Sequence, residues 1–148
     1  MATSTVPAVL DAMVTLFAAG LTEVDVSDGP AVVDNYPDKL AVGYSGRENS
    51  EVVTGDQNAA GIQRGNHPRD EVYFVSCLIN STGGDVMSTR RARAFEILAN
   101  VEAVLRADSS LGGAVGSSGT AQVADFALLQ DLSEPGMFAG LLFRVRVK

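Results

Sequence analysis

The sequence predicts an α+β fold, a single sheet of about five strands with two helices packed on it. Two segments have apolar residues at helical spacing, and several shorter segments are rich in the β-branched and aromatic residues of strands. Their order along the chain, α-β-β-β-α-β-β with one further short strand, lets each helix bury an apolar stripe on the sheet. The 148 residues, 46% of them hydrophobic, suffice for one core, and we expect a single domain over residues 1–148.

The first helix is expected over residues 5–19, where apolar side chains recur every three or four positions. Ser4 or Thr5 can cap its start, and Pro7 lies in the first turn, where proline is tolerated. Gly20 is expected to stop the helix.

Short strands are expected at residues 23–27 and 40–44, each bounded by turn residues, and a shorter one at residues 51–54. The remainder of residues 46–70 is polar and rich in Gly, Asn, Gln and Asp. This composition predicts the most mobile loop of the chain.

Residues 71–80 form the strongest strand candidate, because β-branched and aromatic residues follow one another there without polar alternation. Such a run predicts a central strand buried on both faces. The second helix is expected over residues 85–107, with Asp85 as its N-cap. Arg91 falls on its otherwise apolar stripe and is therefore expected to be partly buried. The apolar residues of the stripe are Met87, Ala94, Ile97, Leu98, Val101, Val104 and Leu105.

The Gly- and Ser-rich residues 112–119 are the second segment expected to be mobile. Residues 121–132 and 138–148 predict two strands that pair as a hairpin. In the last strand apolar and basic residues alternate, so one face should be buried and the other basic. The basic residues are Arg144, Arg146 and Lys148.

The chain carries 11 basic and 18 acidic residues, a net charge of −7, and therefore has no general attraction to nucleic acid or anionic membranes. It also contains no run of 18 apolar residues, so we expect no membrane-spanning segment. Its single cysteine cannot form an internal disulfide, which suits a reducing cytoplasm.

Catalytic signals are weak. His67 is the only histidine, so any serine or cysteine mechanism would have to recruit it as the base. Cys77 lies in an apolar strand, where a thiol is expected to be inert packing. No metal-ligand spacing and no nucleotide-binding motif is present, so we expect no enzyme activity, no cofactor and no metal.

Three arginines in the first turns of the second helix need an explanation, because the helix dipole disfavours cations there. They are Arg90, Arg91 and Arg93. Three alternatives remain open: an ion pair within the chain, an interface with an identical subunit, and a site for phosphate or a nucleic-acid backbone. In the first two, the partner is the acidic stretch of Glu23, Asp25, Asp28, Asp34 and Asp38.

Short motifs in the same order as these elements carry a resemblance to a known family. They are Val-Ser-Asp-Gly-Pro, Leu-Ala-Val-Gly-Tyr, Val-Tyr-Phe-Val-Ser-Cys-Leu-Ile, Asp-x-x-x-x-Arg-Arg-Ala-Arg-Ala, Leu-Gly-Gly-Ala-Val and the closing basic strand. Over residues 5–148 this pattern resembles the tail terminator proteins of bacteriophages with long non-contractile tails.

The resemblance implies a small structural protein that forms a hexameric ring on the last ring of tail-tube subunits. Such a ring stops tube growth and presents the surface that joins the filled head. The implied partners are further copies of the chain, the tail-tube protein and a head-completion or connector protein. The implied location is the virion tail, assembled in the host cytoplasm, with the genome passing through the ring. A head-tail connector or tail-tube component is the structural alternative, and a small-ligand-binding or enzyme domain is the alternative from another class.

Overall fold

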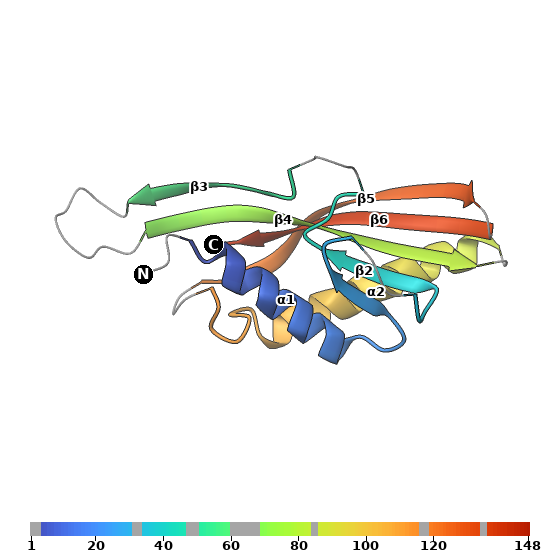
Figure 1. Cartoon of the computed structure of the whole chain (residues 1–148), viewed down its shortest axis with the longest axis horizontal. Helices are drawn as coiled ribbons and strands as arrows, with labels where there is room; N and C mark the ends of the chain where they lie inside the picture. The colour runs from blue at the N-terminus through green and yellow to red at the C-terminus, as the bar shows by residue number, and fades with distance from the viewer. Residues whose placement is uncertain are drawn as a thin grey trace.

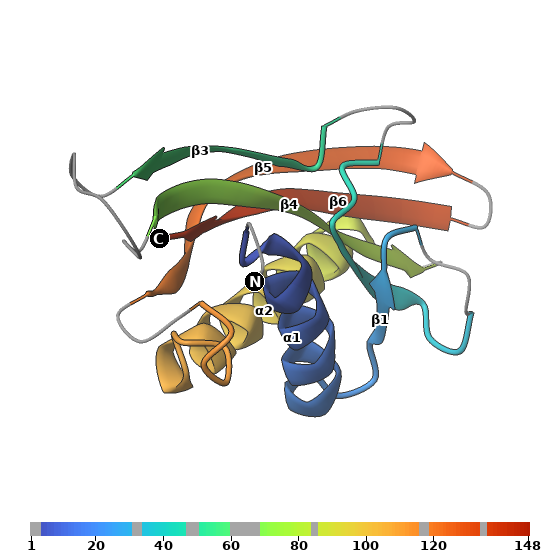
Figure 2. The same cartoon turned by 60° about the vertical axis from the view of Figure 1, so that its left-hand side comes forward.

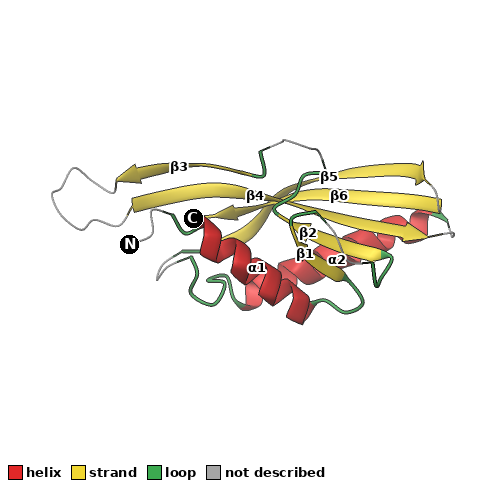
Figure 3. Ribbon diagram, in the orientation of Figure 1, coloured by secondary structure: helices red, strands yellow, loops and turns green. Residues whose placement is uncertain are grey.

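The computed structural model describes residues 4–30, 34–46, 51–59, 69–83, 86–115, 119–133 and 136–148. Two helices cover one face of a mixed sheet of six strands, and no helix lies on the opposite face among the described residues (Figures 1 and 3). The predicted α+β class is therefore confirmed. The sheet has one strand more than the predicted five, because the short strand expected at residues 51–54 extends over Val53–Ala59.

The first helix, α1, spans Val6–Gly20 and buries Val9, Met13 and Phe17 on the sheet. Thr5 precedes it without a side-chain cap of the usual kind. Instead, the carboxylate of Glu71 accepts hydrogen bonds from the Thr5 N–H and hydroxyl, at 2.9 and 2.8 Å. An anionic group from the sheet thus satisfies the helix N-terminus.

Gly20 is the last residue of α1 and has a role other than the predicted stop. A Cβ at this position would lie 2.6 Å from Cγ2 of Val104 on the second helix. Glycine therefore lets the two helices approach closely beneath the sheet (Figure 2).

The strands are arranged in the order β1-β2-β4-β6-β5, and β3 pairs with β4 beside β2. Only β1 and β2 are parallel, and every other pair is antiparallel. The predicted hairpin of the last two strands is confirmed, since β5 and β6 pair along their length. The bounds are Asp25–Asp28 for β1, Asp38–Val42 for β2, Val53–Ala59 for β3, Arg69–Gly83 for β4, Ala121–Ser133 for β5 and Gly136–Val147 for β6.

Strand β4 is longer than the predicted residues 71–80 because it has two successive partners along one edge. Residues 69–75 pair with β3 and residues 77–81 pair with β2, while β6 runs along the other edge from Tyr73 to Gly83. Pairing with β3 holds the N-terminal end of β4 in the sheet, and pairing with β6 holds its C-terminal end, although the polar composition of both ends favours turns.

The prediction that this strand is buried on both faces is wrong. Tyr73, Val75, Cys77 and Ile79 are buried under the helices, but the alternate residues on the outer face are only half-buried. The helices pack on one face alone, so apolar Phe74 and Leu78 lie on the side that no helix covers.

The second helix, α2, spans Met87–Ala107. Its buried residues all belong to the predicted stripe and are Ala94, Ile97, Leu98, Val101 and Leu105, whereas Met87 and Val104 of that stripe are only half-buried. Val86 occupies the N-cap position without a side-chain cap hydrogen bond, and the predicted cap Asp85 lies outside the described residues.

After α2 the chain turns back onto the core, which differs from the expected loose loop. Leu111 and Val115 are 1% and 8% exposed, and backbone hydrogen bonds close the turns between Ser110 and Val115. The mobility predicted for residues 46–70 and 112–119 stays a prediction, although β3 and this turn give order to parts of both segments.

Candidate functional site

Two of the three singled-out arginines converge on one buried carboxylate. Asp38, at the start of β2, is only 7% exposed. Its Oδ2 accepts a hydrogen bond from Nε of Arg93 at 2.8 Å, and its Oδ1 accepts one from the Ser81 hydroxyl at 2.6 Å. Nη1 of Arg90 lies 3.6 Å from the same Oδ1 and donates to the Ser81 hydroxyl at 3.0 Å.

This cluster ties the N-terminal turns of α2 to the sheet. Arg93 also donates to the Thr22 carbonyl at 3.3 Å and pairs with Glu96 at 3.1 Å. The hydrogen bond to Asp38 raises the pKa of Arg93, as do the nearby carboxylates, despite the opposing effect of burial. The first alternative, an ion pair within the chain, therefore accounts for Arg90 and Arg93 at an end of the helix where its dipole disfavours them.

Arg91 does not join this cluster, and the prediction that it is partly buried is wrong. Its position on the apolar stripe predicted partial burial, but the side chain is exposed and donates from Nη1 to Oε1 of Gln130 on β5 at 2.8 Å. The reason is geometric, because the buried stripe of α2 begins only at Ala94.

The remaining carboxylates of the predicted stretch line the β1 edge of the sheet and the turns beside it. We call this group the acidic rim, and it consists of Glu23, Asp25, Asp28 and Asp34. Glu23 and Asp28 are exposed, and Glu23 has a φ of 59°, the left-handed conformation of a tight turn. The structure thus separates Asp38 from the other four residues.

Lys39 is the cation within this rim. Its Nζ lies 3.1 Å from Asp25 and 2.9 Å from Asp34. Desolvation alone would raise the pKa of Asp25, but hydrogen bonds from the Tyr36 and Asn35 N–H groups and from Lys39 outweigh it and lower that pKa. The rim therefore contains four carboxylates, and two of them, those of Asp25 and Asp34, contact the Lys39 ammonium.

Strand β5 forms the opposite edge of the sheet and exposes apolar side chains. Phe126 and Leu128 lie on the helix side, where Phe126 makes an edge-to-face contact with Phe95 at 5.6 Å between ring centroids. Leu129 is 62% exposed and Leu132 71% exposed. The outer edge of this 13-residue strand pairs with no other strand that the structure describes, and an edge of this composition is a template for pairing with another chain.

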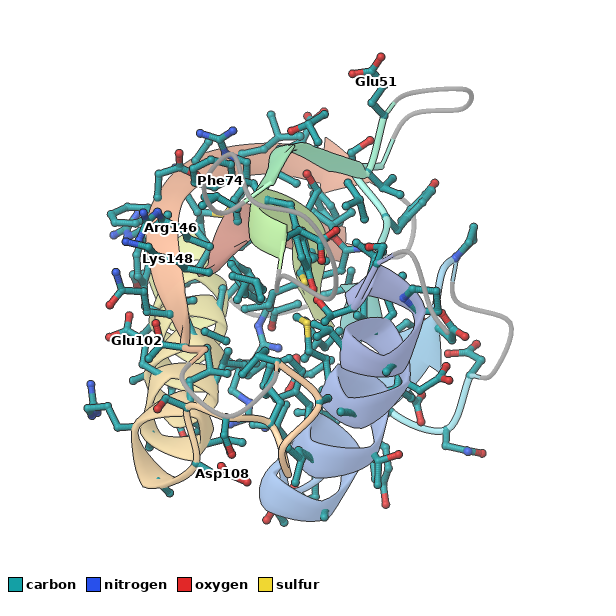
Figure 4. All side chains as sticks on the ribbon, turned by 90° about the vertical axis from the view of Figure 1, so that its left-hand side faces the viewer. Glu51, Phe74, Glu102, Asp108, Arg146 and Lys148 are labelled. Carbon is teal, nitrogen blue, oxygen red and sulfur yellow. The ribbon has the colours of Figure 1, made fainter. Side chains whose placement is uncertain are left out.

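The outer face of the sheet is basic near the end of β6, as the alternation predicted. Arg144 donates from Nε to both carboxylate oxygens of Asp125 at 3.0 Å, and its guanidinium lies 4.7 Å from the centre of the Phe74 ring. Arg146 and Lys148 continue the same face toward the end of the chain, and Figure 4 shows them near Phe74.

The catalytic candidates form no constellation in the part of the chain that the structure describes. Burial raises the pKa of the Cys77 thiol to about 12, so it stays protonated. His67 lies outside the described residues. Within the described ranges, no three His, Cys, Asp or Glu side chains are placed to hold a metal ion. The helices of this same portion are all too short or too polar to cross a membrane.

A depression of about 500 Å³ lies between the end of α2 and the start of β5. Its ionic side chains, Glu102 and Arg106, pair with each other at 3.6 Å along the helix. The rest of its lining is Leu105, Ser109, Thr120, Ala121, Gln122 and Val123. Nothing in this lining pairs a nucleophile with a base.

Comparison with known proteins found no protein-family model that matches the sequence and no curated protein that matches it. The candidate site therefore rests on the residues above. Sequence reasoning found the acidic stretch and the basic strand, but it missed the exposed β5 edge. The available signal was the run Phe126-Ala-Leu-Leu129, which lacks the polar alternation expected of a strand with one solvent-facing side.

Proposed function

We propose that this protein is a structural virion protein that caps a bacteriophage tail tube as a ring. In this role it ends tube polymerisation and provides the surface to which the head joins. The proposal combines the resemblance of residues 5–148 to tail terminator proteins with surfaces that are suited to assembly. The ring would contain six copies, as the resemblance implies.

The observation that carries the proposal is the exposed edge of β5. Proteins that remain monomeric usually protect such an edge with charges, proline, a bulge or a covering element. Here the bulge lies at the start of the strand, between Val123 and Asp125, and the part that follows carries one charge, Asp131, and exposes Leu129 and Leu132. Covering these side chains with another chain removes apolar surface from water, which favours association.

The outer face of β4 supports the same conclusion. A sheet face that remains in water is normally polar, yet Phe74 and Leu78 are placed on this one. The apolar run that predicted burial on both faces is explained if an assembly partner covers the face that the helices leave open.

The test is electron microscopy of tubes polymerised from the tail-tube protein encoded in the same genome. With the protein present, we expect tubes that stop growing and carry a ring at one end. Without it, tube length should be uncontrolled. Uncapped tubes of the same length distribution in both samples would contradict the proposal. A ring that binds the head connector and leaves tube growth unchanged would instead identify a head-tail connector.

A pair of variants links this result to β5. Leu129→Lys combined with Leu132→Lys should melt like the wild type, because both side chains are exposed, but should fail to cap tubes. Val86→Lys changes an apolar residue that is 61% exposed at the start of α2 and serves as the control. Normal capping by the double variant would remove the β5 edge from the assembly surface.

A further inference from the structure

Two surfaces of opposite charge remain after Asp38, Arg90 and Arg93 are paired within the chain. One is the acidic rim at the β1 edge. The other is the run of cations on the outer face of β6, here called the basic stripe, which consists of Arg144, Arg146 and Lys148. Each surface carries charge that its own surroundings do not neutralise.

The basic stripe has one paired cation and two that remain available. Asp125 binds the Arg144 guanidinium and holds it over the Phe74 ring. The side chains of Arg146 and Lys148 form no hydrogen bond or ion pair with any described residue. Arg146 is opposite Phe74 on one side and Gln122 on the other, so both of its strand neighbours are uncharged.

The acidic rim has a matching excess of negative charge. Lys39 contacts two of its carboxylates, those of Asp25 and Asp34, and therefore neutralises one charge of the two. Asp28 forms no ion pair within the described residues, and the Asp34 side chain is 91% exposed despite its contact with Lys39. An approaching cation would find these carboxylates at the surface.

The two surfaces cannot meet within one chain. In the sheet order, β2 and β4 separate β1 from β6, and Figure 2 shows the C-terminus at the left end of the sheet and β1 far from it, toward the right. A contact between two different patches on identical subunits is heterologous. Repetition of such a contact produces a closed ring or a filament rather than a two-fold dimer.

We propose that the basic stripe of one subunit binds the acidic rim of a second copy, head to tail. This inference rests on the proposed function, because it identifies the charged contact that sets the register of the ring. It replaces the interface that the sequence suggested for the arginines of α2. Arg146 and Lys148 provide the cations, while Glu23, Asp28 and Asp34 provide the exposed carboxylates. Charge pairs at the edge of an interface determine register and partner choice more than affinity.

Charge reversal on each surface tests this contact. The stripe variant carries Arg146→Glu with Lys148→Glu, and the rim variant carries Glu23→Lys with Asp28→Lys. Arg106→Glu on α2 and Asp11→Lys on α1 reverse single exposed charges elsewhere and serve as controls. Sedimentation velocity at about 50 mM salt measures self-association, which should weaken as salt rises because these charges are exposed.

Each reversal variant alone should associate at least about tenfold more weakly than the wild type. An equal mixture of the two should restore association, because the acidic stripe of one then faces the basic rim of the other. The mixture would alternate the two chains, and this arrangement closes only in rings with an even number of subunits. Restoration by mixing also excludes misfolding as the cause of either loss.

Several results would overturn the contact. It is wrong if the wild type assembles and both reversal variants assemble equally well, or if the wild type shows no self-association either free or on tubes. It is also wrong if the wild type binds a short DNA duplex through the stripe while self-association is unchanged in the stripe variant. Salt-sensitive association that mixing restores, together with a failure to cap tubes, would instead support this contact and refute the proposed function.

Discussion

Replacing Asp38 with alanine should lower the free energy of unfolding substantially, because this carboxylate balances the positive charges of two guanidinium groups, those of Arg90 and Arg93. The Arg93 hydrogen bond is 2.8 Å long and the Ser81 hydroxyl donates at 2.6 Å. Removing one partner of a buried ion pair costs about 3–5 kcal/mol. The Arg90 and Arg93 side chains are 14% and 21% exposed, so water compensates part of this loss. We expect a decrease of about 2–4 kcal/mol in the free energy of unfolding.

Urea unfolding followed by circular dichroism measures this decrease, and a thermal melt should show a midpoint lower by roughly 5–15 °C. Asp38→Asn keeps an oxygen acceptor while removing the charge, and should lose less stability than Asp38→Ala. Asp34→Ala removes a carboxylate that is 91% exposed and bound to Lys39, and should change stability by no more than about 0.5 kcal/mol. Equal urea midpoints for Asp38→Ala and the wild type would refute the reasoning.

The same argument changes how an arginine variant must be interpreted. Arg90→Glu combined with Arg93→Glu would place two further carboxylates beside buried Asp38. From sequence alone, this variant is expected to be folded but unable to assemble. The structure predicts instead that it unfolds at lower temperature, so loss of assembly would carry no information on the interface.

Three other predictions follow from individual contacts. The Cys77 thiol should resist alkylation at pH 8 until urea unfolds the chain, because its pKa is about 12; rapid labelling of the folded protein would show that the strand is not buried. Gly20→Ala should destabilise the helix pair by about 1–3 kcal/mol and Val104→Ala should partly rescue it, as thermal melts of the single and double variants can show. The hydrogen bond from Arg144 lowers the pKa of Asp125 below its ordinary value of 3.8. The ion pair therefore stabilises the fold fully above pH 3.8, and this stabilisation is lost as the pH falls through the lowered pKa of the folded state. Asp125→Asn should make the urea midpoint depend less on pH in this acid range, and an unchanged pH dependence would refute the pairing.

The sequence predicted correctly those features that depend on residues close together in the chain. The spacing of apolar residues placed both helices to within two residues of their observed ends, because an amphipathic stripe is a property of a single segment. The hairpin of β5 and β6 and the basic face of β6 were predicted for the same reason. The ends of β4 were not, since the ladder bonds that extend it come from β2, β3 and β6.

For the candidate site, too, the sequence predicted the residues but not their partners. Composition singled out the arginines of α2 and the acidic stretch, but it could not choose between a partner in the same chain and a partner in another. Arg93 and Asp38 are 55 positions apart and meet only because α2 packs against the start of β2. Arg91 lies two positions from Arg93 and has a different partner, because the helix turns it toward β5.

The sequence by itself determined the α+β class, the helices, the hairpin and the overall acidity, since each depends on residue composition or on periodicity within one segment. Only the tertiary structure decided that Asp38 is used inside the fold, that one face of β4 stays open and that β5 exposes apolar side chains. These outcomes depend on which face the two helices cover and which strand edge remains unpaired. Both are set by packing between segments far apart in the chain, and no single segment contains that information.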